Sequence, residues 1–163
     1  MAVDVFLKIE GVPGESKDSV HAGEIDVKAW TWSCANLGTA AGGGGIGAGI
    51  VSMQDFCFTQ EMQKSSNVLM QKCATGEHIP KAVLTCRKAG SEQQEYLKVT
   101  FCDLIVSNYV TCGSNESGVP LENISLNFAS MVMEYAEQKI DGSMEGFVGK
   151  GWDQKAKVKK DSV

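Results

Sequence analysis

Residues 38–49 read GTAAGGGGIGAG and join two strand-like segments, residues 25–33 and residues 50–60. Glycine brings backbone freedom but no side chain, so this extended loop cannot build a hydrophobic core of its own. Contacts from elsewhere must order it, and a neighbouring copy of the same chain is the simplest source of such contacts. The sequence therefore favours assembly over catalysis.

Length and charge set the broad class of the protein. The 163 residues predict one domain, 1–163, and an apolar fraction of 43% is ordinary for a globular chain. A formal charge of −5 argues against a nucleic-acid partner. No run of 18 apolar residues exists, so we expect no membrane insertion. The start, MAVDVFLKIEG, lacks the basic and apolar blocks of a signal peptide, so we expect folding in the cytoplasm and any export without a signal peptide.

Alternating apolar residues predict antiparallel strands. Residues 3–9 alternate, and Ile124, Leu126 and Phe128 alternate with Asn123, Ser125 and Asn127. In residues 25–33 the alternation changes phase before Trp30 and Trp32, which predicts a bulge or a change of face, as in sheets that curl into barrels. The tryptophans then share one face of the strand, and Thr31 lies on the other.

One helix and a basic tail complete the predicted fold. The helix is expected near residues 65–75, with Gly76 as its stop. Past Gln138 the periodicity is lost, and residues 153–163 form a basic, solvated C-terminal tail. The expected fold class is mainly β: a small antiparallel β-barrel of two packed sheets, with one flanking helix and the Gly-rich loop.

Motifs for chemistry are weak throughout the sequence. Six cysteines lack CxxC spacing and are mostly flanked by apolar residues, which predicts small buried hydrophobes rather than disulfides or a zinc site. The glycine run formally matches GxGxxG, but a strand-like segment follows it where a dinucleotide fold needs a helix. Cys73 and His78 are close in sequence without a third group to orient them. We therefore expect no catalytic residues, no metal and no cofactor.

Several long stretches resemble one known family. MAVDVFLKIEGVPGESKD, HAGEIDVKAWTWS, VSMQDFCFTQEMQKSS, LMQKCATGEHIPKAVLTCRKAG, EYLKVTF, ENISLNFA and the late Gly151-Trp152 are similar, in order, to the haemolysin-coregulated protein (Hcp) family. The resemblance covers essentially the whole chain. Most of the six cysteines depart from the family pattern.

The resemblance implies a structural role in a bacterial type VI secretion system. Members of the family form a small β-barrel with a flanking helix, assemble into homo-hexameric rings, and stack those rings into the inner tube. The implied partners are other copies of the chain, the contractile sheath, spike and baseplate proteins, and small effector proteins held inside the ring. The implied localisation is cytoplasmic and then secreted.

Two sets of residues are candidates for these roles. For the channel wall and effector binding, the candidates are Thr31, Asn123, Ser125 and Asn127. For contacts between rings or subunits, the candidates are Leu37, Gly42, Gly43, Gly44, Gly45, Ile46 and Gly47, with Ile46 as the only large apolar anchor.

Two other functions stay open on the residues alone. A cysteine-dependent hydrolase predicts one cysteine far more reactive than the rest and a small-molecule cleft. A monomeric carbohydrate-binding β-domain predicts an exposed aromatic platform, which the three tryptophans would have to supply.

Overall fold

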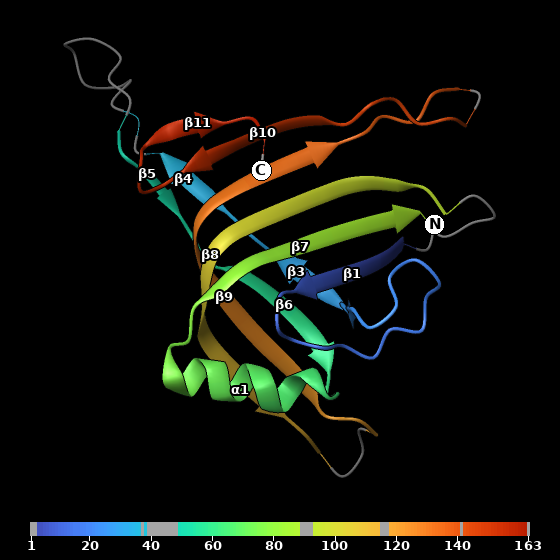
Figure 1. Cartoon of the computed structure of the whole chain (residues 1–163), viewed down its shortest axis with the longest axis vertical. Helices are drawn as coiled ribbons and strands as arrows, with labels where there is room; N and C mark the ends of the chain where they lie inside the picture. Colours follow the sequence, from blue (N-terminus) through green and yellow to red (C-terminus); the bar gives the residue numbers. More distant parts are fainter. Residues whose placement is uncertain are drawn as a thin grey trace.

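The computed structural model describes residues 3–36, 38, 49–88, 93–114, 118–140 and 142–162. Within these ranges the chain forms eleven strands and one helix (Figure 1). In chain order they are β1 (Val3–Ile9), β2 (Ile25–Asp26), β3 (Ala29–Thr31), β4 (Cys34–Asn36), β5 (Val51–Met53), β6 (Phe56–Glu61), α1 (Ser65–Thr75), β7 (Ile79–Lys88), β8 (Glu95–Cys112), β9 (Leu121–Tyr135), β10 (Val148–Asp153) and β11 (Val158–Lys160).

Nine of the strands form one antiparallel sheet. Its order is β11-β10-β9-β8-β7-β1-β2, and β6 pairs with both β9 and β3. The strands β4 and β5 form a separate two-stranded ribbon. The predicted mainly antiparallel fold with one helix is confirmed. The prediction of two packed sheets is wrong, because β9 is long enough to pair with β10 along residues 130–135 and with β6 along residues 121–126, which joins both halves into a single curled sheet.

The described ladders do not form a closed ring, so the predicted closed barrel is not confirmed. The two strands between which the ring stays open, β2 and β3, nevertheless follow each other directly in the chain. The amide of Val27 donates to the Val5 carbonyl at 2.9 Å, and the amide of Lys28 donates to the Thr59 carbonyl at 2.8 Å. The expected change of face falls at this point. Before it, the odd-numbered Ile25 and Val27 are buried, and after it the even-numbered Trp30 packs against the core.

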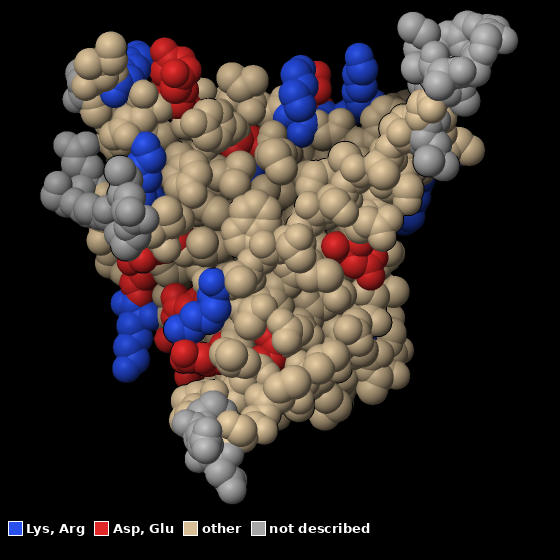
Figure 2. All heavy atoms as spheres, turned by 180° about the vertical axis from the view of Figure 1, so that it is seen from behind, with Lys and Arg blue, Asp and Glu red and all other residues tan. Residues whose placement is uncertain are grey.

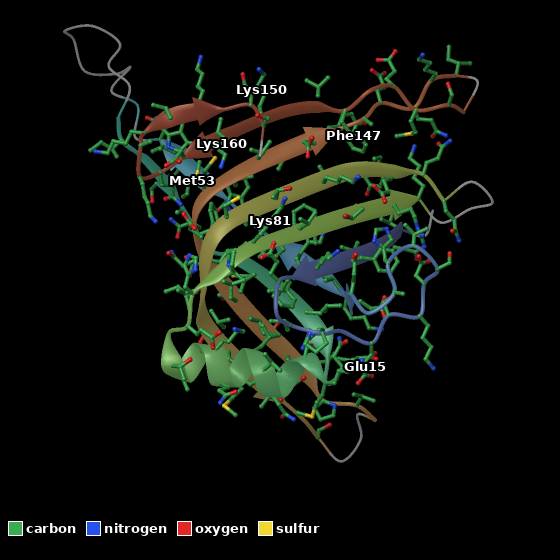
Figure 3. All side chains as sticks on the ribbon, in the orientation of Figure 1. Glu15, Met53, Lys81, Phe147, Lys150 and Lys160 are labelled. Carbon is green, nitrogen blue, oxygen red and sulfur yellow. The ribbon has the colours of Figure 1, made fainter. Side chains whose placement is uncertain are left out.

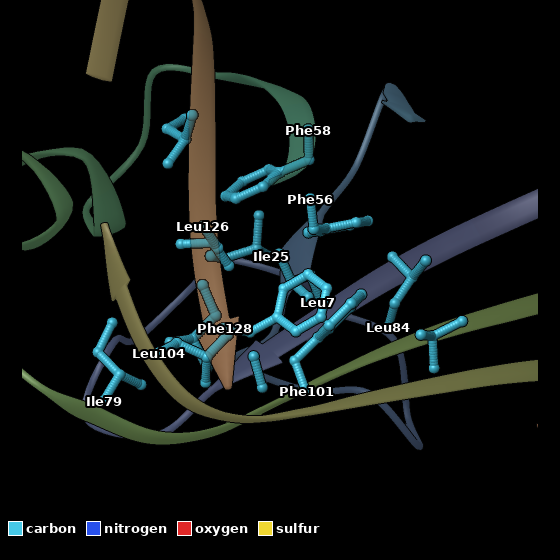
Figure 4. Close-up of a cluster of buried hydrophobic side chains, with 14 of the residues drawn as sticks. Leu7, Ile25, Phe56, Phe58, Ile79, Leu84, Phe101, Leu104, Leu126 and Phe128 are labelled. Atoms are coloured by element: carbon cyan, nitrogen blue, oxygen red, sulfur yellow. The ribbon is translucent and has the colours of Figure 1, made fainter. Parts of the chain in front are cut away.

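The core fills the concave side of the curled sheet (Figure 4). Phe56, Phe101 and Phe128 form its aromatic centre. The ring centroid of Phe101 lies 4.7 Å from that of Phe56 and 4.9 Å from that of Phe128. These phenylalanines come from β6, β8 and β9, so burial of one cluster holds together strands from distant parts of the chain. Such burial is the main stabilising contribution to the fold.

Helix α1 matches the predicted residues 65–75 and ends where Gly76 adopts a left-handed φ of 66°. Its N-cap, Lys64, makes no side-chain capping bond. The first turn is held instead by a buried polar network. Ser66 Oγ and Gln60 Nε2 each donate to Glu122 Oε2 at 2.7 Å, and Tyr109 OH donates to Glu122 Oε1 at 2.5 Å. Burial, and then the bond to this carboxylate, raise the pKa of Tyr109 to about 12.

The C-terminal region forms two strands, β10 and β11, which the loss of periodicity after Gln138 did not predict, while residues 155–159 are exposed as expected for a solvated tail. Strand β10 pairs with β9 over six positions, and β11 pairs with β10. Gly151 lies between these neighbours, and a Cβ there would overlap the Met131 carbonyl oxygen and lie 2.7 Å from the Lys160 carbonyl oxygen. Only glycine lets β9, β10 and β11 approach this closely.

The segment between β1 and β2 is tied to the sheet by a buried arginine. Arg87 is 3% exposed, and its two terminal nitrogens donate to both Asp18 carboxylate oxygens at 3.1 and 2.6 Å. The Arg87 guanidinium also lies 5.0 Å from the centroid of the Phe6 ring, on which His21 stacks. The bond from Arg87 is the largest of the causes that hold the pKa of Asp18 well below its usual range.

This ion pair predicts a specific loss of stability in acid. Because the folded-state pKa of Asp18 lies below its unfolded value of about 3.9, its contribution is complete above that value and is lost as pH falls through the folded pKa. The unfolding free energy of the wild type should therefore fall more steeply between pH 5 and pH 2 than that of Asp18→Asn. Urea unfolding at a series of pH values measures the difference, and parallel curves for the two proteins would contradict it.

Candidate functional site

The candidate channel-wall residues lie on one outer face of the sheet, across three neighbouring strands. Thr31 on β3 is paired with Cys57 on β6, and Cys57 is paired with Ser125 on β9. Two residues further along β6, Thr59 is paired with Asn123 on β9. Residues directly opposite in an antiparallel pair share a face, so these five side chains form two adjacent rows. We call this surface, made of Thr31, Cys57, Thr59, Asn123, Ser125 and Asn127, the polar face.

Burial separates the polar face cleanly from the core. Ile124 and Leu126 are fully buried, whereas Asn123 and Asn127 are exposed and Ser125 is half-buried. Thr31 is exposed, while Trp30 and Trp32 pack partly buried against the core. The alternation predicted from the sequence is therefore confirmed for both strands.

Hydrogen bonds within the polar face fix its side chains. Thr59 Oγ1 donates to Asn123 Oδ1 at 2.7 Å, and the Cys57 thiol lies 3.2 Å from Ser125 Oγ. A shallow groove of about 180 Å³ runs over Thr31, Cys57, Thr59 and Asn123. The groove offers hydroxyl, thiol and amide groups without a formal charge.

At one margin the polar face meets a carboxylate. Asn127 Nδ2 donates to Asp55 Oδ1 at 2.7 Å, and Ser107 Oγ donates to Asp55 Oδ2 at 2.5 Å. Figure 2 shows the molecule from behind, where acidic and basic side chains gather mainly toward the margins of a broad uncharged surface. An uncharged middle with charged borders suits contact with partners of varied surface charge.

Sequence reasoning missed Cys57, Thr59 and Asp55 as members of this surface. The signal was present in β6, where Phe56, Phe58 and Gln60 are buried and alternate with Cys57 and Thr59. Cys57 was grouped with the other cysteines as a small hydrophobe, which hid its position on the polar side of the strand.

The strands that flank the Gly-rich loop, β4 and β5, pair as a two-stranded ribbon (Figure 1). Asn36 is paired with Val51, so the two ends of the loop lie side by side. Leu37 and residues 39–48, including Gly42, Gly43, Gly44, Gly45, Ile46 and Gly47, lie outside the described residues. At the base of the loop, Ile50 is 83% exposed and borders a groove of about 210 Å³ that Trp152 and Lys157 also line.

The cysteines do not behave as one class. All six are free thiols; Cys86 is buried, but Cys34 and Cys112 are exposed, so the prediction of buried hydrophobes is wrong for these two. Burial raises the pKa of the Cys86 thiol to about 11, which makes it a poor nucleophile. His78 Nε2 lies 3.2 Å from Asp103 Oδ1 on the surface, and Cys73 packs partly buried against the core.

Other predicted features can be placed as well. Among the described residues no three His, Cys, Asp or Glu side chains gather as metal ligands would. No described helix has the length and apolar character to cross a membrane. Each of the three tryptophans is at least half covered, which gives little support to a carbohydrate-binding aromatic platform.

Comparison with known proteins identifies the family. Residues 6–135 match the family model described as "Type VI secretion system effector, Hcp". Over 160 residues the chain is 47% identical to "Protein hcp1" of Pseudomonas aeruginosa, covering 97% of this chain and 99% of that protein.

Two solved structures show the same fold. The crystal structure of Hcp1 from Salmonella typhimurium aligns with a TM-score of 0.82 at 37% identity, covering 98% of this chain and all of that one. A structure described as a type six secretion system protein aligns with a TM-score of 0.93 at 26% identity, again covering 98% of this chain and all of that one. The chain belongs to the Hcp family of the type VI secretion system, a family of secreted proteins that are structural and not enzymatic, as the sequence predicted.

Proposed function

We propose that this protein is the subunit of the inner tube of a type VI secretion system, closing sideways into homo-hexameric rings that stack. Rings of this kind are expelled with the spike when the contractile sheath shortens, and they carry small effector proteins in the lumen. The protein folds in the cytoplasm and is then secreted by the type VI system. The observation that carries the proposal is the uncharged polar face, which lies across β3, β6 and β9.

A tube wall needs a sheet without free edges, because exposed strand edges pair indiscriminately. The segment of residues 25–31 supports such a wall, since it hydrogen-bonds to β1 through Val27 and to β6 through Lys28. We propose that this segment closes the curled sheet into the barrel expected from the family. The barrel would then present the polar face as one rigid surface.

The polar face suits the lumen for a chemical reason. Hydroxyl, thiol and amide groups hydrogen-bond to a folded cargo without demanding a complementary charge. Weak contacts repeated around a ring retain a cargo through their number and still release it. We therefore assign Thr31, Asn123, Ser125 and Asn127 to the lumen and add Cys57 and Thr59.

We propose that residues 37–49, which include the Gly-rich loop, contact a neighbouring subunit or ring, with Ile46 as the large apolar anchor. The pairing of the flanking strands β4 and β5 supports this role, because it holds the two ends of the loop together. Baseplate, sheath and spike proteins are further partners of the assembled tube.

One size measurement tests the proposal. Analytical ultracentrifugation of the purified protein should show a species about six times the 17.5 kDa subunit mass, and negative-stain images should show rings. A stable monomer over a broad range of concentrations would reject the ring.

The lumen assignment predicts a separation of assembly from cargo binding. Thr31→Gln should leave ring formation intact, because Thr31 is exposed, while a bulkier side chain in the groove should lower retention of a co-expressed small effector by about tenfold. Gel filtration of the ring with its effector measures both. Thr75→Gln, on the exposed end of α1, is the matched control and should retain effector normally. Loss of the rings themselves in Thr31→Gln would place Thr31 in an interface.

A further inference from the structure

A groove at the beginning of β1 is lined by acidic side chains. It measures about 450 Å³, a size typical of binding pockets, and Val3 and Met62 are among its apolar lining residues. The charged residues that line it are Asp4, Glu15, Asp26, Glu61 and Lys28. Because four carboxylates and only one lysine line this groove, we call it the acidic groove.

Two of these carboxylates form ion pairs with described side chains and two do not. Asp4 accepts a hydrogen bond from Arg87 at 3.1 Å, and Glu61 lies 2.9 Å from Lys28 Nζ. Glu15 and Asp26 have no salt bridge within the part of the chain that the structure describes. Both residues are exposed, and Glu15 Oε1 accepts a hydrogen bond from the Lys64 amide at 2.9 Å, so the groove presents two carboxylates that no described cationic side chain neutralises.

The β10–β11 hairpin carries the opposite charge. Lys150 is paired with Asp161 at 3.1 Å, and Lys155 lies 3.6 Å from Asp103. Lys157 and Lys159 are exposed and form no salt bridge with the described residues. Lys157 stands in the turn with a φ of 57°. The hairpin therefore presents two uncompensated positive charges at its tip and on β11.

These two surfaces lie far apart on one molecule. In Figure 1 the β10–β11 turn lies at the left of the view, and β1 begins at the right. Figure 3 likewise places Lys150 and Lys160 on the hairpin and Glu15 on the opposite, lower side. One chain cannot bring these surfaces together, but two copies can. A contact between different patches on identical copies runs head to tail.

We propose that the acidic groove receives the β10–β11 turn of a second copy, with Lys157 and Lys159 facing Glu15 and Asp26. The inference rests on the self-assembly proposed above and adds the residues that hold successive rings together. A single exposed ion pair contributes little, because solvent screens it and side chains lose freedom. Six such contacts formed at once between two rings act together and set the register of the stack.

Charge reversal gives the test. We measure the concentration at which rings associate into longer stacks by sedimentation velocity at 50 mM salt. Lys157→Glu with Lys159→Glu should raise this concentration at least tenfold, and so should Asp26→Lys. Mixing the reversed-hairpin protein with the Asp26→Lys protein should restore association to near the wild-type level. Association of the wild type should weaken as salt rises to 500 mM, because a Debye length near 10 Å at 0.1 M becomes shorter.

Matched controls separate this contact from net charge and from folding. Glu10→Lys changes the charge by as much as Asp26→Lys does, and Lys8→Glu with Lys139→Glu changes it by as much as the double reversal does. These exposed positions lie outside both surfaces, so both control proteins should associate like the wild type. Thermal unfolding midpoints close to wild type confirm folding of each variant. Normal stacking in both reversals, or no restoration on mixing, would overturn the proposal. Should the wild type form no rings, the hexamer fails, and the same comparison still decides the contact in any head-to-tail species.

Discussion

Glu122→Ala should lower the free energy of unfolding by about 3–5 kcal/mol, a large part of the 5–15 kcal/mol of a typical domain. The Glu122 side chain is fully buried and accepts bonds from Gln60, Ser66 and Tyr109. Alanine would leave these three donors without their acceptor, at roughly 1–3 kcal/mol for each buried group that stays unpaired. Urea unfolding followed by tryptophan fluorescence measures the loss.

The same substitution should loosen the first turn of α1. Because Lys64 provides no side-chain cap, bonds from Ser66 to Glu122 and from Ser65 to Gln60 hold this turn to the sheet, and the substitution removes the shorter of the two. Hydrogen exchange at the amides of residues 65–75 should therefore accelerate more than exchange in β7.

Two variants bracket the effect. Glu122→Gln keeps the shape and one acceptor oxygen, so its loss should be intermediate. Glu134→Ala, a half-buried glutamate on the same strand, should cost no more than about 0.5 kcal/mol. A Glu122→Ala protein as stable as Glu134→Ala would mean that water replaces the carboxylate without penalty.

How far the sequence could predict the molecule depends on whether the signal is local. The alternation at residues 123–128 assigned each side chain of β9 to the core or the polar face, because a strand has a period of two. Helix α1 was equally readable, since Gly76 provides a stop that only a residue tolerant of positive φ supplies readily.

Features that depend on distant partners could not be predicted. Glu122 is an unremarkable acid in the sequence, and its three donors come from residues 60, 66 and 109. Strand β10, VGKGWD, has little periodicity of its own. It becomes a strand because residues 130–135 of β9 offer an unpaired edge, and that edge exists only after residues 97–112 of β8 have paired with residues 121–135 of β9.

In the polar face, the residue type of Cys57 led to a wrong prediction of its environment, whereas its position in the strand would have led to the right one. Cysteine is often buried, and Cys57 sits between two buried phenylalanines. Its neighbours in space are nevertheless Thr31 and Ser125 across the adjacent strands. The phase of a strand is a stronger guide to the exposure of one residue than the average behaviour of its type.

Gly151→Ala should detach the β10–β11 hairpin while the rest of the sheet stays folded. The added Cβ would overlap the Met131 carbonyl oxygen and lie 2.8 Å from Val132 Cα, and backbone atoms paired in a ladder cannot move aside cheaply. Overpacking of this kind costs about 2–3 kcal/mol, and the hairpin lies at the edge of the sheet, where local opening relieves it. Amide exchange in residues 148–153 and 158–160 should accelerate by about 30-fold or more.

Gly146→Ala is the control, since a Cβ there meets no heavy atom within 4 Å, and its exchange should match the wild type. Because the hairpin carries Lys157 and Lys159, its detachment should also weaken ring stacking in Gly151→Ala at unchanged charge. If stacking weakened while amide exchange stayed unchanged, the hairpin would still be docked. The contact with the acidic groove would then depend on the spacing between β9 and β10. Unchanged exchange and unchanged stacking together would mean that β9 and β10 tolerate a wider separation, and the close approach at Gly151 would then have no part in placing the lysines.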